Sequence, residues 1–232
     1  MDENRAHPAI VVAGTDTDVG KTVVSAMLTL ALDGSYWKPV QAGISGGTDT
    51  IRVQQMTCLP WDRFLPEAYG LSQPLSPHRA AELEGVEINP TLLEALPQTH
   101  RNPLVVELAG GLMVPLTPKL LQIDLLARWQ APVVLCARTS LGTINHTLLS
   151  LEALRIRKIP LLGVAFVGEA HQDNESIIVQ MGWVKWLGRM PFLPRLDPSA
   201  LRRAFHGNFH LKDFRPKLRR LPVNAVSTLP GG

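Results

Sequence analysis

The sequence predicts an α/β fold in which a mostly parallel β-sheet lies between two layers of helices. Apolar, β-rich runs alternate with helical patterns along most of the chain, as in right-handed β-α-β crossovers. The runs are apolar throughout, which indicates strands that are covered on both faces. We predict strands near 9–13, 35–41, 103–107, 132–137, 160–167 and 186–190. We predict helices near 20–32, 49–57, 122–130, 145–157, 173–181 and 198–206.

The length of 232 residues, of which 45% are hydrophobic, fits one domain spanning residues 1–232 better than two. The segment 57–89 is the least regular, because four prolines punctuate it, and a short helix is expected after Ser76. A long excursion of this kind in a compact domain is often functional. Residues 221–232 are expected to form a disordered tail.

The composition argues against several kinds of site and partner. The net charge is only +3, and the basic residues that gather after residue 201 form no repeated pattern. We therefore favour a solvated terminal segment over a tail that binds nucleic acid or a membrane. The two cysteines form no disulfide framework, Cys136 lies in an apolar run typical of a core, and the histidines lack zinc-site spacing. The polar N-terminus lacks a signal-peptide core, and no apolar run reaches membrane-spanning length, so we expect a cytoplasmic location.

The segment from Val12 to Thr22 has the layout of a phosphate-binding loop. It reads VAGTDTDVGKT, follows an apolar run and precedes a helical pattern. Backbone N–H groups and a helix N-terminus would bind phosphate, Lys21 would add a cation, and the Thr22 hydroxyl suits Mg²⁺. Five residues rather than four separate Gly14 from Gly20, but the context makes a chance Gly-rich turn the weaker interpretation. The predicted fold class is therefore a three-layer, P-loop NTPase-like α/β fold.

Three later patches place polar residues where ligand-facing loops are expected. Lys38, in WKPVQAG, is suited to neutralising phosphoryl charge, although taken alone it reads as a solvated edge lysine. Asp49 opens a helix, where it either caps that helix or reaches Mg²⁺. Glu107 ends an apolar strand, which is a poor place for a carboxylate without a partner, so a metal-facing role is favoured. Gly110 and Gly111 let the backbone approach a ligand closely.

The order of these motifs resembles the dethiobiotin synthetase family. GTDTDVGKT is followed by WKPVQAG, TD, PLSPHRAAELEG, VVELAGGLMVPL and LGTINHTLLSLEAL, and the similarity covers most of residues 9–206. The resemblance implies a cyclo-ligase that uses ATP and Mg²⁺ to make dethiobiotin from 7,8-diaminononanoate and CO₂. It implies that a carbamate forms on one amine and is phosphorylated, and that the second amine attacks the mixed anhydride. It also implies a homodimer.

The resemblance implies roles for the residues that match the family motifs. Lys38, Lys21 and Thr17 match catalytic positions, and Thr22, Asp49 and Glu107 match Mg²⁺ positions. The matching ATP-binding positions are Asp18, Val19, Gly20, Lys21, Thr22, Val23, Asp49, Glu107, Leu108, Ala109, Gly110, Val167, Gly168, Pro191, Phe192 and Leu193. The matching substrate-binding positions are Ala42 and, from the other subunit, Gly142, Thr143, Ile144 and Asn145. The last four open a helix, whose N-terminus suits a carboxylate.

The chain departs from the family pattern at four places. Asp18 stands where Glu is common, and Ala42 stands where some members have Ser. Leu108 replaces the Gly of an E-G-A-G-G patch, so it would be strained by about 1–2 kcal/mol at positive φ, or would crowd the nucleotide. Val167–Gly168 replaces an Asn-Asp pair that reads adenine, so weaker recognition of adenine and tolerance of other nucleotides are expected. MgATP binding is still expected.

Two other functions remain open at this point. A dimeric P-loop ATPase switch of the partitioning or maturation type shares the fold, but its loop often carries an early Lys where this loop has Thr and Asp. A non-catalytic relative is suggested by Leu108. Retention of the chemistry-bearing residues argues against that second alternative; these are Lys21, Lys38, Asp49 and Glu107.

Overall fold

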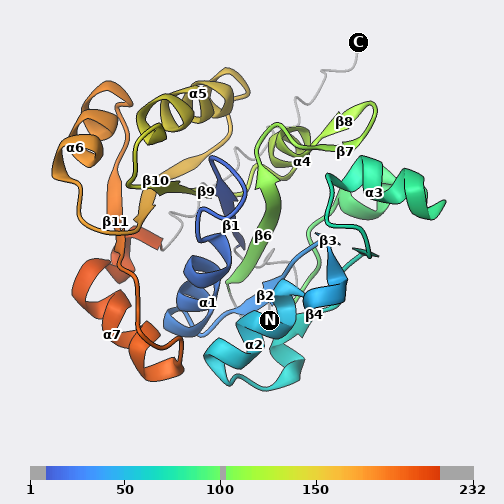
Figure 1. Ribbon diagram of the computed structural model, residues 1–232, viewed down its shortest axis with the longest axis horizontal. Coiled ribbons are helices and arrows are strands. Elements are labelled where there is room, and N and C mark those ends of the chain that lie inside the picture. The colour runs from blue at the N-terminus through green and yellow to red at the C-terminus, as the bar shows by residue number, and fades with distance from the viewer. Residues whose placement is uncertain (1–8, 100–102, 215–232) are drawn as a thin grey trace, which may run out of the picture.

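The central feature is a seven-stranded parallel sheet with the strand order β11-β10-β9-β1-β6-β2-β4 (Figure 1). The structure, a computed structural model, describes residues 9–99 and 103–214. The strands of this sheet are β1 (Ala9–Gly14), β2 (Ser35–Trp37), β4 (Phe64–Leu65), β6 (Leu104–Gly111), β9 (Val133–Arg138), β10 (Leu161–Val167) and β11 (Trp186–Met190).

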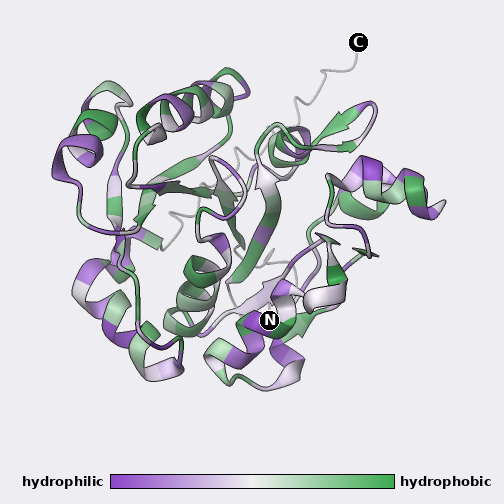
Figure 2. Ribbon diagram, in the orientation of Figure 1, coloured by the Kyte–Doolittle hydropathy of each residue, from purple (hydrophilic) through white to green (hydrophobic). Residues whose placement is uncertain are grey.

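Helices cover both faces of the sheet, which confirms the predicted three-layer α/β class (Figure 1). One face carries α1 (Lys21–Ala31), α2 (Asp49–Thr57) and α7 (Pro198–Asn208), and the other carries α4 (Gln122–Trp129), α5 (Thr143–Ile156) and α6 (Gln172–Met181). Successive strand residues point to opposite faces. On β1, Ile10 and Val12 therefore pack with α1, whereas Val11 packs on the opposite face. Figure 2 shows the central strands and α1 as mainly hydrophobic.

The irregular segment 57–89 contributes the edge strand β4 to the main sheet and further small elements beside it. A separate parallel pair joins β3 (Val40–Ala42) to β5 (Tyr69–Leu71), and α3 (Pro77–Glu84), the helix expected after Ser76, packs against this pair. The antiparallel strands β7 (Pro115–Thr117) and β8 (Leu120–Leu121) border the same apolar cluster. Short 3₁₀ turns lie at Ile44–Gly46, Trp61–Arg63, Pro90–Leu93 and Leu211–Phe214.

The predicted strand 35–41 is wrong as a single element. The chain forms β2 beside β6 and then leaves the main sheet, so that β3 pairs with β5 in a separate sheet. The break falls at Lys38 and Pro39. Proline has no N–H to donate to a strand ladder, which favours a break at this point. Lys38 consequently lies at the carboxyl end of a short strand rather than within a long one.

The other predicted core elements are present within a few residues of their expected bounds. Cys136 is fully buried in the core, and burial raises the pKa of its thiol to about 12, as befits an unreactive packing residue. Among the described helices, none is long and apolar enough to cross a membrane. The tail predicted at 221–232 lies outside the described residues.

Candidate functional site

The candidate site is built at the carboxyl ends of the three adjacent strands β1, β6 and β2. β1 lies between β6 and β9, and the loop 15–20 connects it to α1. Strand register aligns Val12 with Glu107 and Trp37 with Val106. Lys38, which follows Trp37, therefore lies next to Glu107. Ligands of open parallel sheets bind at this edge, where loops from neighbouring strands converge.

Left-handed backbone conformations give the loop between β1 and α1 its curvature. Asp18 has φ 55° and Gly20 has φ 93°. A Cβ atom on Gly20 would also lie 2.6 Å from Cγ1 of Val167, so both conformation and space require glycine there. Lys21 follows Gly20, and its Nζ donates to the carbonyl oxygen of Asp16 at 2.8 Å. The lysine thus lies across the loop that it follows.

Glu107 is the most completely enclosed acid of the site. It lies on β6 with no exposed surface, on the same face of the sheet as α1 and α2. Its Oε1 accepts hydrogen bonds from the Thr22 hydroxyl at 2.8 Å and from the Lys38 ammonium at 3.0 Å. Its Oε2 accepts a hydrogen bond from the Tyr36 hydroxyl at 2.9 Å. The partners that a buried carboxylate requires are therefore all present.

Asp49 faces the same centre from the first turn of α2. Its carboxylate forms ion pairs with Lys38 and, at 3.3 Å, with Arg52. Its backbone N–H donates to the side-chain oxygen of Gln41 at 3.0 Å. The interpretation of Asp49 as the helix cap is wrong, because the side chain of Thr48 accepts the capping hydrogen bond from Ile51. The Asp49 carboxylate is therefore available to the centre of the site.

Burial and charge act differently on the two lysines. Burial by itself would lower the pKa of Lys38, but the Glu107 and Asp49 carboxylates raise that pKa above its usual value. Burial lowers the pKa of Lys21, and the charge of Lys38 lowers it further, against the opposing effect of Glu107. Burial, followed by the charge of Glu107, raises the pKa of Tyr36 well above its usual value. Lys38 is therefore a cation at neutral pH, and Tyr36 a neutral donor.

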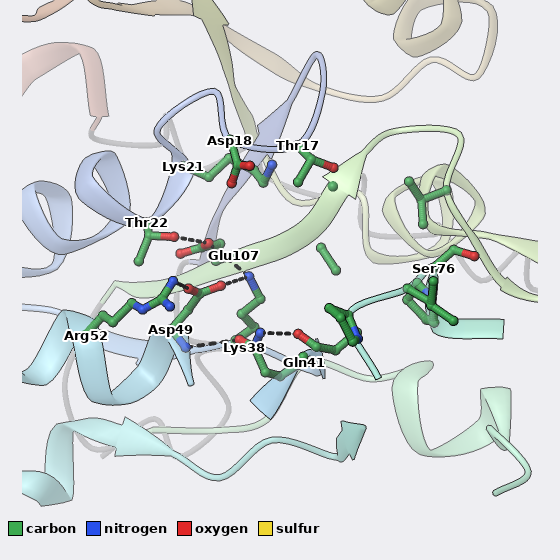
Figure 3. A pocket seen from close by; sticks show the side chains of 18 of the residues that line it. Thr17, Asp18, Lys21, Thr22, Lys38, Gln41, Asp49, Arg52, Ser76 and Glu107 are labelled. Carbon is green, nitrogen blue, oxygen red and sulfur yellow. Dashed lines mark hydrogen bonds and ion pairs between the residues drawn. The ribbon is translucent and has the colours of Figure 1, made fainter. Parts of the chain in front are cut away.

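Lys21, Thr22, Lys38, Asp49 and Glu107 line one cavity of about 740 Å³ (Figure 3). Lys21 and Lys38 both reach it, so the two predicted catalytic lysines lie together. The residues of the predicted set that line the cavity are Thr17, Asp18, Gly20, Lys21, Thr22, Val23, Lys38, Ala42, Asp49, Glu107, Ala109 and Gly110. The sequence prediction missed lining residues from β3, α2, the start of α3 and three connecting segments; they are Gln41, Gly43, Gly47, Arg52, Pro74, Leu75, Ser76, Pro77 and Val114. Most of these residues lie within the motifs that carried the family resemblance. Those motifs do not indicate which side chains point into the cavity.

Leu108 does not cause the problems that its sequence position suggested. It is not among the described residues with positive φ, and its side chain is 1% exposed within the core on the α4 and α5 side. Neighbouring strand residues point to opposite faces, so Leu108 turns away from the face that carries Glu107. Both expectations, backbone strain and crowding of the nucleotide, are therefore wrong. Val19, another predicted contact, is likewise buried in a core cluster.

Two other predicted groups lie outside this cavity. Val167 packs against the phosphate loop at Gly20. A Cβ on Gly168 would lie 3.9 Å from the ring of Phe192, the middle residue of the predicted segment Pro191–Leu193. These residues form a second group around the ends of β10 and β11. The segment Gly142–Asn145 opens α5 and does not line the cavity, and Gly142 and Asn145 are exposed.

The oxygen atoms around Lys38 fit a magnesium ion that shares its coordination with phosphate. Thr22, Asp49 and Glu107 contribute one hydroxyl and two carboxylates, which are the hard ligands that Mg²⁺ prefers. Within residues 9–99 and 103–214, no group of three or more His, Cys, Asp or Glu could hold a metal ion. Mg²⁺ commonly uses one or two carboxylates together with substrate phosphates, so this smaller set fits that mode.

The fold, the loop and the two lysines together define a P-loop protein of the nucleotide-binding class. In agreement with this, a family model described as an AAA domain matches residues 8–200. A dethiobiotin synthetase of Rhodopseudomonas palustris (strain BisA53) is 59% identical over 89% of this chain and 96% of its own length. Another, from Afipia carboxidovorans, is 56% identical over 88% of this chain and 97% of its own. The chain belongs to the ATP-dependent dethiobiotin synthetase family, which confirms the predicted resemblance and the prediction of a cyclo-ligase enzyme.

Solved structures share the fold at low sequence identity. The cell division ATPase MinD of Pyrococcus furiosus aligns with a TM-score of 0.51 and 13% identity, over 87% of this chain and 98% of that one. A ParA family ATPase of Chlorobium tepidum aligns with a TM-score of 0.50 and 11% identity, over 88% and 99%. These similarities concern the fold alone. They confirm the P-loop architecture without favouring a partitioning switch.

Proposed function

We propose that this chain catalyses the ATP-dependent carboxylation and ring closure of 7,8-diaminononanoate with CO₂ to give dethiobiotin. The observation that carries the proposal is that Lys21, Lys38 and three oxygen ligands of magnesium type meet in one cavity. The names of the close relatives support the same reaction. The carbamate and the carbamoyl-phosphate mixed anhydride are the intermediates that we propose for it.

The phosphate end of the site follows from the loop between β1 and α1. The N-terminus of α1 has no side-chain cap, so its N–H groups are suited to phosphate oxygens. We propose that Lys21 pairs with the outer phosphates and that Thr22, Asp49 and Glu107 hold Mg²⁺. When bound, Mg²⁺ would neutralise charge on the phosphate oxygens. Thr17 and Asp18 line the loop side of the same cavity.

Lys38 is suited to the reacting groups because it stays positively charged. Two carboxylates raise the pKa of Lys38, so at neutral pH it neutralises charge rather than accepting a proton. We propose that it holds the carbamate oxygen against the γ-phosphate. Phosphorylation turns that oxygen into a leaving group, and attack by the second amine at the carbamate carbon releases phosphate and closes the ring. Holding the reactants in line can remove about 7–11 kcal/mol of the barrier.

The nucleotide base is assigned to the group around Val167, Gly168 and Pro191–Leu193. This group adjoins the phosphate loop, because Val167 packs on Gly20. Its side chains offer hydrocarbon surface and an exposed Phe192 ring, but not the amide and carboxylate that read adenine in some family members. We therefore propose that this end discriminates weakly between bases. Competition of GTP or CTP with ATP for the protein tests this assignment.

A second copy of the chain is needed to complete the substrate end. Gly142–Asn145 do not line the cavity of their own chain, and the Thr143 hydroxyl donates to the carbonyl of Arg138 at 2.5 Å. Next to them Leu141 is fully exposed, and Leu149 and Ile156 of α5 are also exposed. We propose that this surface pairs in a homodimer and that the start of α5 binds the substrate carboxylate of the partner's site.

One assay tests the proposed reaction directly. The purified protein is incubated with 7,8-diaminononanoate, bicarbonate and MgATP, and the product is identified by mass. Formation of the cyclic urea, with one ADP released per ring, supports the proposal. ATP hydrolysis without the urea, or hydrolysis that requires a protein partner, contradicts it.

A further inference from the structure

Tyr36 contacts Glu107 from the side of the protein core. Tyr36 is completely buried on β2 and does not line the cavity, whereas Glu107 does. Its hydroxyl donates to Oε2 of Glu107 at 2.9 Å. The ring packs in the core beside Phe64, with the two ring centroids 6.1 Å apart. The hydroxyl is therefore held in place by packing on one side and by the carboxylate on the other.

The two oxygens of Glu107 have different partners. Oε1 contacts Thr22 and Lys38, two residues that line the cavity, whereas Oε2 contacts Tyr36. A carboxylate held only through Oε1 would be less restricted in rotation about its last side-chain bond. A donor at Oε2 restricts that rotation and so fixes the direction in which Oε1 points. Groups that orient a metal ligand in this way commonly affect metal affinity by 10–100-fold.

We propose that Tyr36 is a positioning residue, whose hydroxyl orients Glu107 for magnesium-dependent nucleotide binding. The inference rests on the proposed function, because it takes Glu107 as a ligand of the nucleotide-bound Mg²⁺. Tyr36 touches neither substrate nor metal and acts only through Glu107. A tyrosine kept merely to fill the core would affect stability without changing the dependence of nucleotide binding on Mg²⁺.

The test is a titration of ATP binding by calorimetry, without the diamine, across a range of Mg²⁺ concentrations and in excess chelator. Tyr36→Phe keeps the ring and removes only the hydroxyl. Tyr69→Phe is the matched control, because the Tyr69 hydroxyl accepts from the Asn89 N–H at 2.8 Å and Tyr69 does not line the cavity. We expect Tyr36→Phe to raise the Mg²⁺ concentration for half-maximal binding about 10-fold or more, with binding in chelator unchanged. Tyr69→Phe should match the unmodified protein.

Two results would overturn the role of Tyr36. One is a Mg²⁺ requirement in Tyr36→Phe equal to that of Tyr69→Phe, and the other is an equal loss of ATP binding with and without Mg²⁺. If Tyr36→Phe does not fold, Tyr36→Met, which also lacks a donor, is titrated in its place. If the unmodified protein itself shows no Mg²⁺ dependence, the magnesium site of the proposed function is rejected instead, and the inference is rejected with it.

Discussion

The centre around Glu107 and the start of α5 differ in how completely one chain satisfies them. At the centre, the carboxylates of Glu107 and Asp49 are buried and bonded to Lys38, and Glu107 is also bonded to Thr22 and Tyr36. The first turn of α5 has no side-chain cap, and the Leu141 beside it is fully exposed. One chain therefore preassembles the part of the site that suits phosphate and metal. We propose that the substrate carboxylate end depends on a second copy.

The largest effect is expected at the buried centre. Lys38→Met keeps much of the side-chain bulk but removes the charge. Ring closure should fall about 10³-fold, because the group that we propose to neutralise the reacting oxygens is lost. Steady-state assay of urea formation measures this loss. Lys185→Met is the matched control, since Lys185 is half-exposed, also pairs with a carboxylate (that of Asp213) and does not line the cavity. Activity of Lys38→Met within a few fold of the control would contradict the role of Lys38.

A substitution at Leu108 tests whether this buried side chain stabilises the core or crowds the nucleotide. Leu108→Ala should lower the free energy of unfolding by about 2–5 kcal/mol, because it leaves a cavity in a packed core. Urea denaturation measures this change, and kcat should stay close to that of the unmodified protein at a temperature where the variant is folded. Leu83→Ala, at an exposed position on α3, is the control. Increased activity with unchanged stability would mean that Leu108 crowds the nucleotide after all.

Sequence patterns predicted the main elements and most of the site, but not the short strands or the contacts between residues far apart in the chain. Continuous apolar runs and helical periodicity predicted the main strands and helices, because each is long enough to carry a pattern. The short strands β3, β4, β5, β7 and β8 have two or three residues each, too few for any period to be detected. Motif order predicted most of the cavity lining. The bond from Tyr36 to Glu107 joins residues 71 positions apart, and a buried tyrosine alone reads as a core aromatic.

Asn145 tests the other region. Asn145→Ala should raise the KM for 7,8-diaminononanoate about 10-fold, because it removes the hydrogen bond that we propose to the substrate carboxylate. A hydrogen bond to a charged group contributes about 1.5 kcal/mol at the lower end of its range. The KM for ATP should be nearly unchanged, since Asn145 does not line the cavity of its own chain. Initial-rate measurements with each substrate varied separately distinguish the two. An equal rise in both KM values would remove the distinction between the regions.

The smallest effect is expected at the periphery, where Asp197 caps α7. Hydrogen bonds from the Ala200 N–H and the Ser199 hydroxyl lower the pKa of Asp197 below its usual value. Its stabilisation is therefore present above the unfolded pKa of about 3.9 and is lost as pH falls through the lower folded pKa. Asp197→Ala should be slightly less stable than the unmodified protein at pH 7, with a difference that shrinks in acid. Urea titrations at several pH values measure it.

Asp197→Asn is the control for that experiment, because asparagine also caps helices but does not titrate. It should retain most of the stability at pH 7 and show no loss of its own through this pH range. A difference between Asp197→Ala and the unmodified protein that persists unchanged below the folded pKa would contradict the assigned cap. Ring closure should be the same in all three proteins, since Asp197 does not line the cavity.

The division of one site between two chains is tested most directly by mixing two impaired subunits. Lys38→Met and Asn145→Ala chains, carrying different affinity tags, are produced together. Urea formation by the mixed population is compared with each variant alone at a 7,8-diaminononanoate concentration well below the KM of the unmodified protein, where Asn145→Ala is itself impaired about 10-fold. If Lys38 and Asn145 of different chains serve one site, half of the sites in mixed dimers are intact. About a quarter of normal activity should then return at equal expression. Activity no greater than the average of the two separate variants would contradict the account.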